Sequence, residues 1–124
     1  MGWEVRPDSL TSTLLTLRAR FPKLPPVYIT ENGAAFADTV APDGSVDDPL
    51  RVGFLESHIA AAMAAKRKGV PIEGYFVWSI LDNFEWAYGY RPRFGIVHVD
   101  FATQKRTPKT SYERFASWIR SARG

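Results

Sequence analysis

Two stretches of this sequence place carboxylates where an enzyme could use them. The first holds Glu31, which follows a short run of β-branched and aromatic residues (27–29) and precedes an Asn-Gly pair. An acid at the tip of a short apolar strand is typical of α/β enzymes, whose strand ends carry the chemistry. The second stretch, residues 79–90, holds Asp82 and Glu85 among several aromatic side chains. Aromatic rings stack on the C–H face of a pyranose, and sugar hydroxyls donate hydrogen bonds to carboxylates.

Each stretch also has a purely structural interpretation. Asn32-Gly33 is a common hairpin turn, which would leave Glu31 as a solvated acid beside it. A hairpin needs a second alternating strand, and residues 34–38 contain no β-branched run, so the hairpin is the weaker interpretation. The aromatic residues of 79–90 could equally fill a hydrophobic cap. The residues alone favour neither this cap nor a sugar site.

The first stretch is expected at the end of a helix–strand unit. Pro7 and Asp8 suit the first turn of a helix that stops before Pro22, and its apolar residues recur at helical spacing. The prolines at 25 and 26 then prevent a helix and lead into the strand 27–29. The predicted buried stripe of this first helix comprises Leu10, Leu14, Leu17 and Phe21.

A second helix–strand unit is expected to carry the aromatic stretch. After a polar loop (34–48), Asp48 as N-cap and Pro49 as first helical residue predict a helix that Gly69 ends. The apolar run 74–78 predicts a second strand, and the order strand, helix, strand predicts a right-handed unit with parallel pairing. The predicted buried stripe of this second helix comprises Val52, Leu55, Ile59 and Met63, with His58 partly buried or on the surface beside it.

The last part of the chain is expected to form a strand, a turn and a final helix. Residues 94–101 alternate partially and predict a strand, which the polar turn 102–106 follows. Thr107-Pro108 predicts the start of the final helix, with Thr110 to Glu113 as an alternative capping box. The predicted inner face of this final helix comprises Tyr112, Phe115 and Ile119.

The composition excludes several kinds of site. The 124 residues include no Cys, which excludes disulfides and thiolate chemistry, and the two His lack a metal-like spacing, so we expect no metal or cofactor. The net charge is +3, but the basic residues are dispersed, which ranks nucleic-acid binding last among the possible functions. No apolar run reaches membrane-spanning length and the first residues do not form a signal peptide. We therefore expect a soluble, cytoplasmic protein that binds neither nucleic acid nor membranes.

Three segments carry a resemblance to a known family. They are Tyr-Ile-Thr-Glu-Asn-Gly at 28–33, Gly-Tyr-Phe-Val-Trp-Ser-Ile-Leu-Asp-Asn-Phe-Glu-Trp at 74–86 and Arg-Phe-Gly-Ile-Val-His-Val-Asp-Phe at 93–101. A lone Thr-Glu-Asn-Gly would be a weak signal, and the tryptophan segment at the expected distance downstream makes the combination specific. Together the segments closely resemble glycoside hydrolase family 1, the retaining β-glucosidases, over essentially the whole chain.

The resemblance implies an α/β fold, a (β/α)8 TIM barrel of which this chain holds strands seven and eight with their flanking helices. It also assigns roles to five residues. Glu31, at the end of the seventh strand, would be the nucleophile, and Trp78 would form the platform beside the reacting sugar. Glu85 would bind the hydroxyls on C4 and C6 of that sugar, and Trp86 would bind the hydroxyl on C3. Phe94 would lie near its exocyclic group.

The resemblance further implies that residues 1–124 are the C-terminal segment of a single catalytic domain. Family members run to several hundred residues, and their general acid/base lies in a Thr-x-Asn-Glu-Pro segment that this chain lacks. Retaining hydrolysis needs two carboxyl groups about 5–5.5 Å apart. The resemblance does not make Glu85 this second carboxyl group, because the role that it implies for Glu85 is to bind sugar.

Two functions follow from these observations. The first is hydrolysis of terminal β-D-glucosyl residues, or of the related galactosyl or fucosyl residues. It requires a complementary N-terminal barrel portion, present as a second chain, that supplies the acid/base Glu. The alternative is a catalytically inactive fragment that binds sugar or protein through its aromatic loop. A phosphorylated sugar would need a Ser/Lys-type phosphate site after Asp82-Asn83-Phe84, and Glu85 at that place favours an unphosphorylated one.

Overall fold

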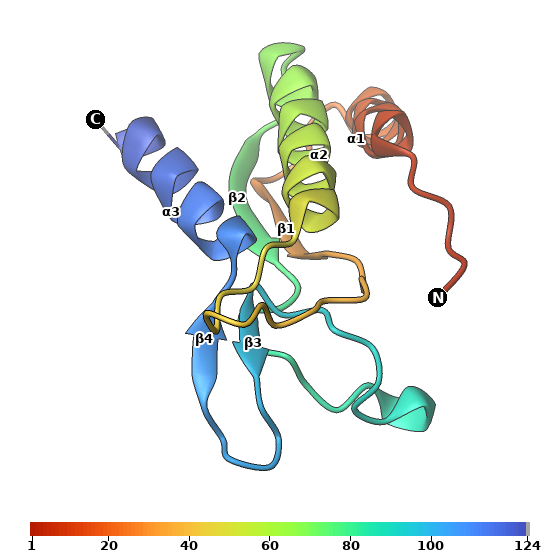
Figure 1. The fold of residues 1–124 in the computed structure, drawn as a ribbon. Helices are drawn as coiled ribbons and strands as arrows, with labels where there is room; N and C mark the ends of the chain where they lie inside the picture. The colour runs from red at the N-terminus through yellow and green to blue at the C-terminus, as the bar shows by residue number, and fades with distance from the viewer. Residues whose placement is uncertain (124) are drawn as a thin grey trace.

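Two parallel strands joined by a long helix form the centre of the fold (Figure 1). The computed structural model describes residues 1–123. Strand β1 (Val27–Asn32) pairs in parallel with β2 (Ile72–Val77), and helix α2 (Pro49–Arg67) connects them. Helix α1 (Pro7–Arg20) packs beside α2. The predicted parallel pairing is confirmed, and a hairpin at residues 32 and 33 is excluded because β1 pairs with β2 instead.

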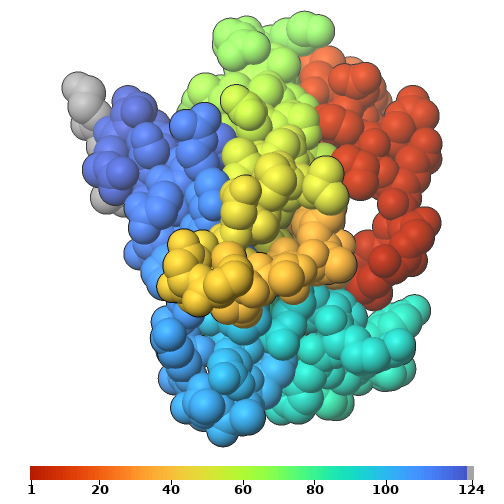
Figure 2. All heavy atoms as spheres, in the orientation of Figure 1, coloured from red at the N-terminus to blue at the C-terminus, as the bar shows by residue number. Residues whose placement is uncertain are grey.

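A second layer consists of the chain between β2 and the last helix. A long loop holds the short 3-10 helix η1 (Trp86–Tyr88), and β3 (Val97–Val99) then pairs antiparallel with β4 (Arg106–Pro108). Figure 2 shows the loop that follows β1 as a band between this layer and the helices. Helix α3 (Thr110–Arg123) returns along the side of α2.

The final helix begins later than the sequence predicted. Thr107 and Pro108 pair with the strand β3, so they belong to β4 and not to the first turn of a helix. The predicted strand 94–101 is shortened to Val97–Val99, since only these residues find partners in β4. The predicted capping box is also wrong, because the Thr110 hydroxyl donates to a carboxylate oxygen of Asp47 at 2.8 Å.

The predicted inner faces of the helices are only partly correct. In α3, Phe115 packs against a buried cluster, while Tyr112 and Ile119 are exposed. In α1, Leu14 is buried, while Leu17 and Phe21 are exposed. Helical spacing predicts which residues share a face, but it does not say whether another element covers that face.

Helix α2 is buried over a wider arc than one apolar stripe. Leu55 is fully buried as predicted, but Met63 is exposed. His58, predicted to be partly buried or on the surface, is buried and stacks on Phe54 with ring centroids 3.9 Å apart. The cause is that α2 contacts α1 on one side and α3 on another, where its small alanines permit close approach.

One face of the two-stranded sheet has no covering element among the described residues. Tyr28 of β1 and Phe76 of β2 are 55% and 56% exposed. The described strands form two separate two-stranded sheets and no closed barrel. This bare surface is what two strands taken from a larger barrel would leave.

Two kinds of feature are absent from the part of the chain that the structure describes. None of the helices in residues 1–123 is both long and apolar enough to cross a membrane. Within the same residues, no three His, Asp or Glu side chains gather in a way that could hold a metal ion.

Candidate active site

The five residues to which the resemblance assigns roles line one open hollow of about 470 Å³. It lies where the C-terminal ends of β1 and β2 meet the long loop of the second layer. Three residues that the sequence did not single out for the site lie there too. The lining residues are Trp3, Glu31, Asn32, Gly33, Trp78, Glu85, Trp86 and Phe94.

Glu31 reaches this pocket through an irregularity in β1. Ile29 pairs with Tyr75 and Asn32 with Val77, so β1 advances three residues where β2 advances two. An extra residue in one strand reverses the alternation of side chains beyond it, as a bulge does, and bulges next to active sites re-aim a side chain. The irregularity therefore lets Glu31 line the pocket, while Ile29 packs on the core beneath α1 and α2.

The chain after Glu31 lies directly against the chain after β2. The Trp78 amide donates to the Asn32 carbonyl at 2.9 Å. A Cβ atom on Gly33 would overlap the Trp78 carbonyl oxygen, so a side chain fits here only if the Trp78 main chain moves. The Asn-Gly pair that looks like a hairpin turn in the sequence is thus a crossing point, at which Gly lets the main chain carrying Glu31 touch the one carrying Trp78.

Aromatic rings form the rest of the pocket wall. Phe94 is buried, and its ring centroid lies 6.4 Å from that of Trp3. Trp86 is 84% exposed, so almost its whole indole is free to contact a ligand. Its backbone φ is 42°, in the left-handed region that bulky residues rarely adopt. Strained residues concentrate at binding sites, where the surrounding structure holds them.

Hydrogen bonds within the loop orient Glu85. The Asn83 amide nitrogen donates to a Glu85 carboxylate oxygen at 3.3 Å, and the Ser79 hydroxyl lies 3.1 Å from the Asn83 amide oxygen. The Glu85 amide donates to the Gly89 carbonyl at 2.8 Å across the turn of η1. Glu85 therefore extends from a loop that hydrogen bonds of both the backbone and the side chains hold in place.

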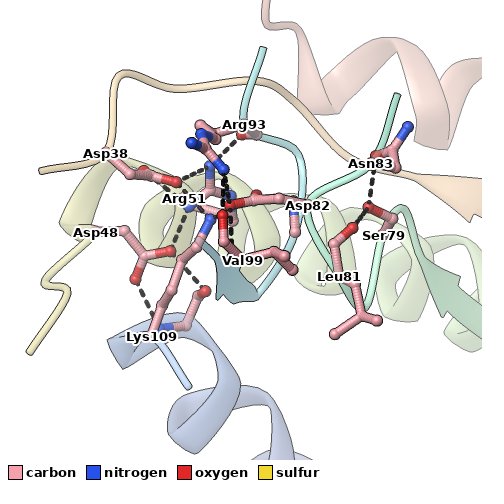
Figure 3. Close-up of polar contacts among 12 residues, drawn as sticks. Asp38, Asp48, Arg51, Ser79, Leu81, Asp82, Asn83, Arg93, Val99 and Lys109 are labelled. Carbon is pink, nitrogen blue, oxygen red and sulfur yellow. Dashed lines mark hydrogen bonds and ion pairs between the residues drawn. The ribbon is translucent and has the colours of Figure 1, made fainter. Parts of the chain in front are cut away.

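Asp82, the other acid of the aromatic loop, lies outside the pocket. It is buried and accepts four hydrogen bonds (Figure 3). Its donors are the Lys109 amine at 2.9 Å, the Arg93 guanidinium at 3.0 Å and the backbone amides of Gly95 at 3.0 Å and Val99 at 3.3 Å. The ion pair between Asp82 and Arg93 joins the two ends of the segment that carries Glu85 and η1. Asp82 thus holds the base of this loop and does not line the pocket.

The same buried ion cluster continues to the start of α2. Arg51 forms a two-pronged ion pair with Asp38, both distances being 3.0 Å, and contacts Asp48 at 2.5 Å. Lys109 bridges Asp38 and Asp82. Asp48 occupies the predicted N-cap position of α2, but its side chain makes no capping hydrogen bond. Its carboxylate instead accepts from the amide and hydroxyl of Ser111 in α3, at 2.8 and 2.6 Å. Three acids and three bases (Asp38, Asp48, Asp82, Arg51, Arg93 and Lys109) balance one another beneath the pocket.

Comparison with known proteins agrees with this geometry. A family model described as Glycosyl hydrolase family 1 matches residues 1–123. The chain belongs to this family. The predicted fold class is confirmed as well, since the crystal structure of a psychrophilic β-glucosidase from Micrococcus antarcticus, a TIM barrel, matches 97% of the chain with a TM-score of 0.95 and 50% identity.

Family-1 relatives also show how much of a whole member this chain represents. Beta-glucosidase A of Thermotoga maritima is 54% identical over 111 residues, which are 90% of this chain and 25% of that protein. A protein of Bifidobacterium breve named as a bifunctional β-D-glucosidase/β-D-fucosidase is 42% identical over 123 residues, or 26% of its length. The chain covers 26% of the Micrococcus structure. It therefore spans about a quarter of the length of these family members.

Local sequence patterns do not predict that three of the pocket residues line the pocket. The sequence offers Asn32 and Gly33 as a possible turn and as part of the family segment 28–33, but their contacts to the chain after β2 depend on the parallel pairing. Trp3 lies in the extended segment before α1, where nothing in the local pattern predicts that it approaches Phe94.

Replacing Gly33 by Ala is expected to displace the Trp78 main chain, because the new methyl group would overlap a carbonyl oxygen and not a flexible side chain. We expect a destabilisation of about 1–3 kcal/mol, the cost of overpacking. Urea unfolding would measure it in a chimera in which this chain replaces the matching segment of the Thermotoga maritima protein (the barrel chimera).

Gly53→Ala is the matched control for this substitution. Gly53 is exposed on α2 and a Cβ atom there would meet nothing within 4 Å, so Ala should stabilise the helix by about 0.5–1 kcal/mol. Equal stabilities of the Gly33→Ala and Gly53→Ala chimeras would contradict the close approach at Gly33.

Proposed function

We propose that this chain is the nucleophile-bearing part of a retaining β-glucosidase. The observation that supports it most is the shared pocket: Glu31 at the end of β1 lies in the same hollow as the aromatic residues Trp78, Trp86 and Phe94 and the acid Glu85. A carboxylate facing aromatic walls and a second hydrogen-bonding acid suits a pyranose. The family membership and the β-glucosidase names of the similar proteins agree with this substrate class.

The proposed reaction has two steps. In the first, a carboxylate oxygen of Glu31 attacks the anomeric carbon, the bond to the aglycone oxygen breaks, and an acid from outside this chain protonates that oxygen. In the second, water attacks the same carbon, the same outside group takes its proton, and the bond to Glu31 breaks. Two inversions give net retention. Both steps need the second carboxyl group about 5–5.5 Å from Glu31.

The remaining pocket residues bind the sugar in this proposal. Trp78 supplies the apolar platform, and Glu85 accepts from the hydroxyls on C4 and C6. Trp86 donates from its indole N–H to the oxygen on C3, and Phe94 bounds the exocyclic group. A carboxylate at position 85 would repel a 6-phosphate, so the proposed substrate is an unphosphorylated glucoside, with fucosides and galactosides as the nearest alternatives.

A complementary N-terminal barrel portion is part of the same proposal. The exposed face that holds Tyr28 and Phe76 is an apolar surface that the remaining strands of a barrel would cover. The chain also spans only a quarter of its relatives, which leaves room for the acid/base residue in the remainder. We propose that this remainder acts as a second chain or as the rest of one polypeptide.

The barrel chimera tests the function directly. We expect it to hydrolyse an aryl β-D-glucoside and to release β-glucose first, which proton NMR detects before mutarotation. The isolated chain, which lacks the acid/base residue, should release no aglycone. A chimera that folds and binds glucose but never hydrolyses the glucoside would instead support the inactive sugar-binding fragment.

Glu85→Gln should lower kcat/KM of the barrel chimera for an aryl β-D-glucoside about 10–150-fold, because a hydrogen bond to a charged acceptor contributes about 1.5–3 kcal/mol. The loss should be smaller for the aryl β-D-xyloside, which lacks the C6 hydroxymethyl group. Glu56→Gln, at an exposed position of α2, is the control and should change neither substrate. Equal losses on both sugars would contradict a contact between Glu85 and the C6 hydroxyl.

A further inference from the structure

A partly buried hydrogen bond from β2 holds the residue next to Glu31. The Tyr75 hydroxyl donates to the Asn32 amide oxygen at 2.6 Å, a short distance for two neutral groups. Burial raises the pKa of Tyr75 well above its usual value, so this hydroxyl stays protonated and remains a donor. The ring itself packs on the apolar cluster beneath α1 and α2.

Asn32 is held at a second point by the same strand. Its carbonyl oxygen accepts from the Trp78 amide at 2.9 Å, just beyond the end of β2. One bond therefore fixes the side chain of Asn32 and another its main chain, both from residues of β2 or immediately after it. Gly33, in contact with the Trp78 carbonyl, continues this attachment by one residue.

These bonds lie where the irregularity of β1 ends. The extra residue of β1 lies between Ile29 and Asn32, and Glu31 belongs to this irregular segment. A segment with one residue more than its partner has no regular ladder to fix it, so its conformation depends on its two ends. Ile29 is fixed at one end by the core, and Asn32 is fixed at the other end by Tyr75 and Trp78.

We propose that Tyr75 is a positioning residue that aims the Glu31 carboxylate through its hydrogen bond to Asn32. This inference rests on the proposed function, in which Glu31 is the nucleophile. Tyr75 itself does not line the pocket. Its role is to keep the extra residue of β1 in the one arrangement that directs Glu31 at the anomeric carbon.

The attack step can be measured alone with 2-deoxy-2-fluoro-β-D-glucosyl fluoride. A Glu31 oxygen bonds to the anomeric carbon, fluoride leaves, and the fluorine on C2 slows the second step so that the ester accumulates. In the barrel chimera with Tyr75→Phe, we expect the saturating rate of ester formation to fall about tenfold or more, because small misplacements of reacting groups slow a reaction strongly. The dissociation constant of the reagent should change less than twofold, because the sugar contacts remain.

Two controls separate positioning from general structure. Tyr112→Phe removes a hydroxyl from the exposed side of α3 and should leave the rate unchanged. Asn32→Ala should slow ester formation by a similar factor, and adding Tyr75→Phe to it should slow it no further, since the hydroxyl acts through Asn32. Thermal unfolding of all variants identifies any that fail to fold. If Tyr75→Phe is one of them, the rate of ester formation in Asn32→Ala still tests whether this hydrogen bond positions Glu31.

The outcomes are distinct. If the unmodified chimera forms no ester, the proposed function fails and this inference with it. If the unmodified chimera forms the ester and Tyr75→Phe forms it at the same rate, only the positioning role fails. If the effects of Tyr75→Phe and Asn32→Ala multiply in the double variant, Tyr75 acts by a route other than Asn32, and the inference is also wrong.

Discussion

Glu31→Gln in the barrel chimera is expected to abolish turnover of an aryl β-D-glucoside, with kcat falling roughly 10⁴–10⁶-fold, as when a catalytic nucleophile is removed. The amide keeps the size of the side chain but is too weak a nucleophile to attack the anomeric carbon. Binding of glucose-like inhibitors should be nearly unchanged, because the aromatic walls and Glu85 remain. Steady-state kinetics and inhibitor titration measure the two effects separately.

A chemical rescue makes this test specific for a nucleophile. In Glu31→Gly, the space left by the carboxylate admits azide, which should attack the anomeric carbon from the same side while the bond to the aglycone oxygen breaks and the acid from outside this chain protonates that oxygen. The product would be α-glucosyl azide. Near wild-type turnover in Glu31→Gln, or rescue that gives the β-azide, would show that another group attacks. Glu56→Gln serves again as the unaffected control.

The largest effect on stability is expected from the buried ion cluster. The Lys109 amine is fully buried and lies 2.5 Å from Asp38 and 2.9 Å from Asp82, whose side chains are almost fully buried too. Lys109→Met would leave two buried carboxylates without a shared partner. Removing one member of a buried ion pair costs about 3–5 kcal/mol, and we expect a loss of this size in the urea unfolding of the barrel chimera.

Two further variants check the cause. Lys109→Met combined with Asp38→Asn should recover part of the loss, because it removes one of the unpaired charges. Lys105→Met, at an exposed position before β4, should change stability by less than about 0.5 kcal/mol, as surface substitutions do. A loss below about 1 kcal/mol for Lys109→Met, or no recovery in the double variant, would contradict a balanced buried cluster.

The sequence predicted the parts of the fold that local patterns control. The prolines before 27 and the apolar run 74–78 mark the two strands, although β1 extends beyond the predicted 27–29 to Asn32 and β2 runs from Ile72 to Val77. The start of α2 at Pro49 and its end before Gly69 follow from ordinary helix signals. The position of Glu31 at a strand end follows from the same reasoning. Because parallel strands end at one edge, the acid and the aromatic loop could be expected to meet, as they do in the pocket.

The buried charges could not be predicted in this way. Asp38, Arg51 and Lys109 are 13 or more positions apart in the sequence, and each by itself is typical of a solvated surface. Their burial depends on the fold bringing opposite charges together, which a local pattern does not record. The same holds for β4, where pairing with β3 overrides a plausible helix start at Thr107-Pro108.

The shared use of Asp48 has a consequence for local unfolding. Asp48 lies at the start of α2, yet its carboxylate bonds the amide and hydroxyl of Ser111 in the first turn of α3. Arg51 in the first turn of α2 donates to the same carboxylate, so neither helix start can fray without loosening a hydrogen bond that holds the other. The amide hydrogens in the first turns of α2 and α3 should therefore exchange with solvent deuterium as one cooperative unit, with a single opening free energy, although 60 residues of chain separate them.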